Sequence, residues 1–107
     1  MRTRPDAVFR SLADPTRRAL LERLMQKGEH TVGALTGHAN VSQPAVSKHL
    51  GVLKAAGLVE DRRDGRETHY RARPAGFAPL FGWLTFYSAF WNDRFTRLED
   101  LLKRMGP

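Results

Sequence analysis

The sequence predicts a mainly α-helical fold, built as one domain over residues 1–107, that carries a single β-hairpin and ends in a long helix. Three observations predict this class. Apolar residues recur at spacings of three and four through most of the chain, as in helices with one buried face. The dipeptide Asp64-Gly65 separates two strand-like segments, 58–63 and 66–73, as in a hairpin. Helical spacing then returns over residues 76–105.

Four helices are expected before the hairpin. A short first helix ends near Leu12, and the other three begin after residues whose side chains cap helix N-termini: Asp14, Thr31 and Ser42. Pro15 suits the first position of the second helix, and Pro44 is tolerated in the first turn of the fourth. Two glycines are expected to end the second and fourth helices: Gly28 and Gly57.

Each of these helices has an apolar face that we expect to point into the core. The inward residues are Leu20, Leu21 and Leu24 in the second helix, Val32 and Leu35 in the third, and Val46, Leu50 and Leu53 in the fourth. If Asp64 and Gly65 form the turn of the hairpin, its register also follows. Three chemically compatible pairs then lie opposite each other: Arg62 with Glu67, Glu60 with His69, and Val59 with Tyr70.

The C-terminal helix carries two apolar stripes. The longer stripe contains Leu80, Leu84, Tyr87, Trp91, Phe95, Leu98 and Leu102, and the second contains Trp83, Phe86 and Phe90. One stripe is enough to dock the helix on its own domain, so the second needs another protein surface, most simply the same helix of a second copy. We therefore expect residues 76–105 to form a dimerisation helix. Its interface residues are expected to be Trp83, Phe86, Tyr87, Phe90 and Trp91.

Residues 31–56 combine two short helices with a tight turn between them, which is typical of a DNA-binding helix–turn–helix. Residues of the second helix that point away from the core are small or polar, which suits close approach to a duplex. Gln43 and Ser47 can hydrogen-bond base edges, and Lys48 suits a phosphate or a guanine. The other candidate DNA contacts in this segment are Thr31, Ser42, Pro44, Ala45, His49 and Lys54, with His49 expected beside the hairpin.

Three arginines surround the tip of the hairpin: Arg62, Arg63 and Arg66. Cations on a projecting β-ribbon can reach phosphates or a narrow minor groove, and a helix–turn–helix followed by such a two-stranded β-wing is a winged helix. The net charge of +7 favours a polyanionic partner. Residues 1–75 hold 14 basic and 8 acidic residues, whereas residues 76–107 hold 4 and 3, so the charge lies mainly on the winged-helix part.

Four segments carry a more specific signal: residues 12–18 (LADPTRR), 41–50 (VSQPAVSKHL), 53–59 (LKAAGLV) and 62–66 (RRDGR), the last followed by Tyr70. Together they strongly resemble the ArsR family of bacterial winged-helix repressors, and the resemblance covers nearly the whole chain. It implies a homodimeric transcriptional regulator that binds double-stranded DNA at an inverted-repeat operator near a promoter, usually as a repressor.

The sequence departs from the metal-sensing members of this family. The resemblance implies a Cys-x-Cys pair in their sensing helix, or Asp and His ligands on their last helix. The matching stretch 31–36 is TVGALT, the chain has no cysteine, and its last helix has no histidine. His30 and His38 could come together across the short helix, but zinc-ligand spacing is lacking. We expect no metal site and no cofactor, and a subgroup without the cysteine motif.

Other classes of function find little support. Ser42 and Ser47 have no Gly-rich elbow or oxyanion element around them, and no phosphate-binding glycine loop occurs, so we expect no enzyme. The uncharged span 74–92 is interrupted by Pro and Gly, and no signal peptide is visible, so we expect a cytoplasmic protein without a membrane segment. Two alternatives stay open. One is a ligand-sensing regulator whose unknown effector binds among the aromatics of the dimer interface, and the other is a winged helix used only for protein–protein contact.

Overall fold

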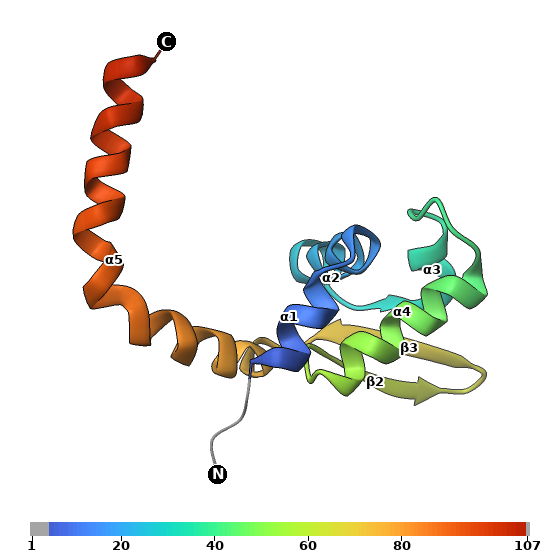
Figure 1. Ribbon diagram of the computed structural model, residues 1–107. Coiled ribbons are helices and arrows are strands. Elements are labelled where there is room, and N and C mark those ends of the chain that lie inside the picture. Colours follow the sequence, from blue (N-terminus) through green and yellow to red (C-terminus); the bar gives the residue numbers. More distant parts are fainter. Residues whose placement is uncertain (1–4, 107) are drawn as a thin grey trace.

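The computed structural model describes residues 5–106, apart from the side chain of residue 89. The predicted order of four helices, a hairpin and a long helix is confirmed, with one short strand and one 3-10 turn in addition (Figure 1). The elements are α1 (Asp6–Leu12), α2 (Pro15–Lys27), β1 (His30–Thr31), α3 (Val32–Thr36), α4 (Gln43–Ala55), β2 (Val59–Asp64), β3 (Glu67–Ala72), η1 (Pro74–Phe77) and α5 (Ala78–Met105).

The three predicted N-caps are confirmed. Each capping oxygen accepts a hydrogen bond from the backbone N–H three residues later: Asp14 from Arg17 at 2.9 Å, Thr31 from Ala34 at 3.1 Å and Ser42 from Ala45 at 3.3 Å. These bonds satisfy N–H groups that have no partner inside the helix. Gly28 follows α2 with φ +83°, and Gly57 follows α4 with φ +81°, a region that glycine enters without steric cost.

Two arginines of α2 fix its first turn to the end of α1. Arg17 donates to the carbonyls of Ser11 (2.7 Å) and Arg10 (3.0 Å), and Arg18 donates to the carbonyl of Leu12 (2.7 Å). The last carbonyls of a helix lack partners within it, so these side chains satisfy them. These bonds tie the start of α2 to the end of α1.

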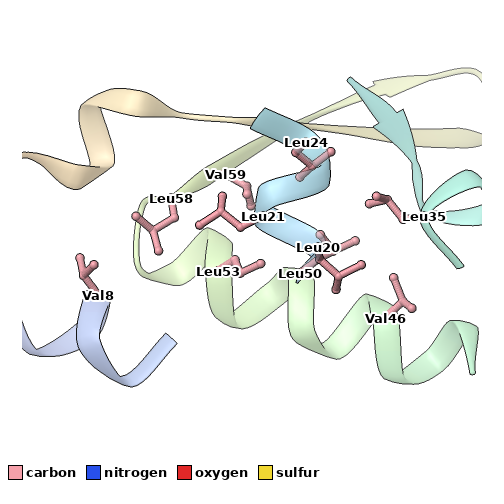
Figure 2. Close-up of a cluster of buried hydrophobic side chains, with 10 residues drawn as sticks. All are labelled: Val8, Leu20, Leu21, Leu24, Leu35, Val46, Leu50, Leu53, Leu58 and Val59. Carbon is pink, nitrogen blue, oxygen red and sulfur yellow. The ribbon is translucent and has the colours of Figure 1, made fainter. Parts of the chain in front are cut away.

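The core lies where α1, α2, α3, α4 and the start of β2 meet (Figure 2). Its buried side chains are Val8, Leu20, Leu21, Leu24, Leu35, Val46, Leu50, Leu53, Leu58 and Val59. The inward faces predicted for α2 and α4 are therefore confirmed, as is Leu35, and Val32 packs against the core while half-buried. Burial of each such leucine stabilises the fold by about 1.5–3 kcal/mol, so α4 is held firmly by its three inward residues.

The sheet has three antiparallel strands in the order β1-β3-β2. β1 was not predicted, because two residues are too few to show an alternating pattern. It pairs with the middle of β3, where His30 lies opposite Tyr70 and Thr31 opposite His69. This third strand ties the hairpin to the segment that enters α3.

The predicted register of the hairpin is wrong. The observed pairs are Val59 with Ala72, Glu60 with Arg71, Asp61 with Tyr70, Arg62 with His69, Arg63 with Thr68 and Asp64 with Glu67. The two-residue turn is therefore Gly65-Arg66 rather than Asp64-Gly65. Gly65 has φ +62°, and no residue other than glycine has positive φ in the described chain, as expected for a type II′ turn. A type I′ turn at Asp64-Gly65 would have placed an aspartate in the left-handed region.

α5 leaves the winged-helix body on the side opposite the hairpin tip (Figure 1). Within residues 5–106, only the first turns of α5 contact the other elements: Leu80 packs against the core, and the Trp83 ring lies edge-on to Phe9 with centroids 5.3 Å apart. The docking of α5 on its own domain is thus limited to the start of the helix. A helix of 28 residues is about 42 Å long, and it runs beyond this small body. No helix among the described residues is long and apolar enough to cross a membrane.

Candidate nucleic-acid interface

The outward face of α4 is open and carries the residues expected to read DNA. Gln43, Pro44, Ser47 and Lys48 are exposed, and Ala45 is half-buried. Val46, Leu50 and Leu53 anchor the opposite face in the core. In Figure 1 the N-terminal end of α4 and the tip of the β2–β3 hairpin point to the same side of the molecule. The helix–turn–helix and the wing can therefore meet one duplex together.

Thr31 and Ser42 stand at the N-termini of α3 and α4, and their hydroxyl oxygens already accept backbone hydrogen bonds. A hydroxyl group also has one proton to donate, so both side chains can still bond a phosphate oxygen. The N-terminus of a helix carries partial positive charge and favours anions. The capping role and the predicted DNA contact are thus compatible at both residues.

Arg62 lies in a cluster of charges that ties the hairpin to the segment before β1. Its Nε is 2.7 Å from Oε1 of Glu29, and its Nη1 is 3.6 Å from Oδ2 of Asp64. The same Glu29 oxygen lies 3.8 Å from Nδ1 of His69, whose Nε2 is 3.6 Å from Glu67. The predicted pairing of Arg62 with Glu67 is therefore wrong, and Glu29 takes that place.

Arg63 and Arg66 at the tip have much weaker ties. Arg63 Nε lies 3.5 Å from the Gly65 carbonyl oxygen, at the limit of a hydrogen bond. No ion pair to Arg66 occurs within residues 5–106, and both side chains are exposed. These guanidinium groups contribute little to the stability of the fold. On a duplex they would neutralise phosphates and release counterions, which favours binding.

Lys54 is engaged inside the domain. Its Nζ is 3.0 Å from Oδ1 of Asp61, which joins the last turns of α4 to β2. The hydrogen bond with Asp61, together with the carboxylate charge, raises the pKa of Lys54 above its usual value. Its side chain is half-exposed, and its charge is shared with Asp61.

His49 contacts the start of α2. Its Nδ1 is 4.0 Å from Oδ2 of Asp14, and the side chain is mostly covered. The hydrogen bond from the Arg17 backbone N–H holds the pKa of Asp14 below its usual value, and the charge of His49 lowers it further. The contact joins the recognition helix α4 to the start of α2.

Sequence reasoning missed the acidic residues that hold the wing in place. Besides Glu29 and Asp61, Glu60 bonds Arg71 across the hairpin at 2.7 Å. The corrected register places Glu60 opposite Arg71, so the right turn would have identified this pair. Glu29 and Arg62 are far apart in the sequence, and only the addition of β1 to the sheet brings them together.

The two histidines considered as ligands do come together. The rings of His30 and His38 lie edge to face with centroids 6.5 Å apart. No group of three or more His, Asp or Glu side chains in the described part of the chain could hold a metal ion. Nδ1 of His30 instead lies 2.7 Å from the carbonyl oxygen of Gly28.

The aromatics expected at the dimer interface all lie on α5 and stack along it. Ring centroids are 4.9 Å apart for Trp83 and Tyr87, 5.0 Å for Phe86 and Tyr87, and 5.0 Å for Phe90 and Trp91. Phe86 is 77% exposed and Phe90 53%, which is unusual for large apolar side chains on one helix. α5 therefore presents an apolar surface that the described residues leave uncovered.

An outward-facing recognition helix with an arginine-tipped wing defines a winged helix–turn–helix protein of the kind that binds DNA. A family model described as a helix-turn-helix domain matches residues 12–62. The HTH-type transcriptional regulator Rv2034 of Mycobacterium tuberculosis is 43% identical over 102 residues, which are 95% of this chain and 92% of that protein.

Two solved structures agree with the fold. The ArsR family transcriptional regulator RHA00566 is 30% identical, with a TM-score of 0.73 over 86% of this chain and 97% of that one. The homodimeric winged helix-turn-helix DNA-binding domain Mb0332 of Mycobacterium bovis, a possible ArsR-family regulator, is 31% identical, with a TM-score of 0.62 over 78% and 77% of the two chains. The chain belongs to the ArsR family of transcriptional regulators.

Proposed function

We propose that the protein is a homodimeric, sequence-specific DNA-binding repressor whose α4 enters the major groove while the β2–β3 wing contacts the backbone or the minor groove. One observation carries this proposal: the tip of the β2–β3 hairpin, with the weakly tied arginines Arg63 and Arg66, points to the same side of the molecule as the N-terminal end of α4. The tip arginines and the exposed side chains of α4 contribute little to the stability of the fold. Binding to a duplex would give both a role, in phosphate contact and in base reading.

The roles of individual residues follow from their positions. Gln43 and Ser47 read base edges, and Gln43 suits a bidentate contact to adenine. Lys48, Thr31 and Ser42 contact phosphates, and the small side chains of Pro44 and Ala45 let the helix approach closely. Lys54, His49 and Arg62 act mainly as ties that set the positions of α4 and the wing.

The second copy pairs through α5. The exposed aromatics of this helix need a cover, and an identical helix supplies one of matching size and character. The homodimeric state of the Mb0332 domain supports this assignment. Residues 76–107 are nearly neutral, so pairing them brings little charge together and leaves the basic surfaces for DNA. Repression then follows from occupation of an operator near a promoter, and a cytoplasmic location is part of the same proposal.

Selection of bound sequences from random duplex DNA tests the proposal. The expected product is an inverted repeat with half-sites about one helical turn, or about 10 base pairs, apart. Retention on duplex DNA should also fall steeply with salt. Failure to enrich any sequence, together with salt-independent retention, would overturn DNA binding and favour a winged helix used only for protein contact. Enrichment of a single half-site would overturn the dimeric arrangement.

A further inference from the structure

A cavity of about 400 Å³ lies between α2 and the segment that joins α3 to α4. Much of its wall is apolar, with Ala19 and Leu20 on one side and Leu35 and Val41 on the other. Its volume falls within the range that binds small molecules in proteins. It is separate from the aromatic surface of α5 and from the outward face of α4.

Two of the polar residues that line this cavity, Arg23 and His38, are hydrogen-bonded to each other. Nη2 of Arg23 lies 3.0 Å from Nε2 of His38. Because arginine only donates, this imidazole nitrogen must be the acceptor. Nε of Arg23 is buried and has no acceptor among the described residues. Nε is covered by protein atoms, so the guanidinium can meet a ligand in the cavity only through its outer N–H groups, which form charge-assisted hydrogen bonds with anionic oxygens.

We propose that this cavity binds a small organic acid, with its carboxylate on Arg23 and its apolar body against Ala19, Leu20, Leu35 and Val41. A carboxylate fits better than a phosphate because the described residues supply one guanidinium here and no second cation. One carboxylate oxygen would accept from the outer N–H groups of the Arg23 guanidinium, and His38 would hold the guanidinium in its present orientation. The ligand would therefore need both a single negative charge and an apolar part.

Occupation of the cavity would act on the recognition helix. Asn40 and Val41 line the cavity and directly precede Ser42, the N-cap of α4. A bound acid would fix this segment and add a negative charge close to the end of α4 that faces DNA. We therefore expect the acid to weaken operator binding about tenfold, and the operator to weaken acid binding equally. This regulatory part rests on the proposed DNA-binding function, whereas the binding of the acid does not.

Binding is tested by NMR titration of the full chain with hexanoate and benzoate. Their uncharged counterparts, hexanamide and benzamide, and inorganic phosphate serve as controls. We expect saturable shifts of the backbone amides of Ala39 and Asn40 with a Kd of about 1 mM for at least one carboxylate. Arg23→Gln should weaken this binding at least about tenfold, since the charge-assisted bond is lost. Arg104→Gln removes the same charge from the last turn of α5 and should leave it unchanged.

A second variant, Ala19→Phe, fills the cavity while keeping Arg23, and it should also abolish binding if the ligand occupies that space. Absence of saturable shifts with both carboxylates overturns the site, as does equal binding of the amides, tighter binding of phosphate, or unchanged binding by Arg23→Gln. Operator affinity is then measured with and without the carboxylate. Binding of the acid without any effect on operator affinity overturns the regulatory role alone. Failure of the unliganded protein to bind any duplex counts against the proposed function and not against the acid site.

Discussion

Gly76 lies against the backbone of Gly57 so closely that a Cβ at position 76 would stand 2.6 Å from the Gly57 carbonyl carbon and 3.1 Å from the Leu58 nitrogen. Gly76 is buried within η1, and Gly57 ends α4. The contact therefore joins the entry to α5 with the exit from the recognition helix. Only a residue without a side chain permits this approach.

We expect Gly76→Ala to destabilise the protein by about 3 kcal/mol, because the added methyl group meets backbone that cannot move aside cheaply. Chemical denaturation measures the free energy of unfolding. Gly82→Ala is the matched control, since a Cβ there meets no atom within 4 Å and alanine favours the helix. Equal losses in the two variants would contradict the close contact.

Acid should remove part of the stability through Asp14. The pKa of its carboxyl is lowered in the folded state, mainly by the hydrogen bond from the Arg17 N–H. A depressed folded pKa means that this stabilisation is complete above the ordinary value of 3.8 and is lost as the pH falls through the lower, folded value. Asp14→Asn keeps a capping oxygen without a charge, so its unfolding free energy should fall less between about pH 5 and pH 2. If the unfolding free energy fell equally with pH in both proteins, the Asp14 carboxylate would not be the source of the acid sensitivity.

The wing arginines should differ in their effect on the salt dependence of DNA binding. Arg66→Ala should weaken binding to all duplexes and reduce the slope of log K against log salt by about one unit. Arg62→Ala should reduce that slope by less, because Glu29 already neutralises much of its charge. Affinities measured at four or more salt concentrations provide the slopes. A larger effect of Arg62 than of Arg66 would show that the wing rearranges on DNA.

Loss of a base-reading residue should change preference rather than overall affinity. We expect Gln43→Ala to cost about 1–3 kcal/mol on the selected operator and little on unrelated duplex. Competition between the two duplexes measures this difference. An equal loss of affinity for both duplexes would instead indicate that Gln43 contacts the DNA backbone.

Dimerisation should depend on the exposed aromatics of α5. Phe86→Glu places a charge where the proposed interface is apolar, and it should weaken the dimer about 100-fold or more, since both copies lose the buried ring. Sedimentation over a range of concentrations provides the dissociation constant. Thr96→Glu adds the same charge to the polar side of the helix and should leave the dimer intact. Equal effects of both variants would place the interface elsewhere.

Features encoded by neighbouring residues could be predicted from the sequence, and features that depend on distant ones could not. The caps at Asp14, Thr31 and Ser42 need only three residues of context, and all three are confirmed. The hairpin turn was misplaced by one residue because Asp64-Gly65 and Gly65-Arg66 both contain the glycine that a tight turn requires. The alternation of faces is the same in both registers, so hydrophobicity could not distinguish them.

The candidate DNA-reading side chains of α4 could be placed on its outer face from helical periodicity alone, because Val46, Leu50 and Leu53 fix its orientation. The partners of the charged residues could not be predicted from the sequence. Glu29 meets Arg62, and Arg23 meets His38, only through the arrangement of the sheet and of the α3–α4 segment. The partner of a long polar side chain depends on the tertiary arrangement, so the local sequence spacing does not predict it.

The projection of α5 away from the body separates two kinds of specificity. Beyond its first turns, a substitution in this helix disturbs neither the leucine core nor the face of α4. In the proposed dimer, the choice of partner can therefore change while the base preference within each half-site stays the same, and the reverse also holds. Exchange of residues 84–105 between related regulators should therefore transfer the preference for a dimerisation partner.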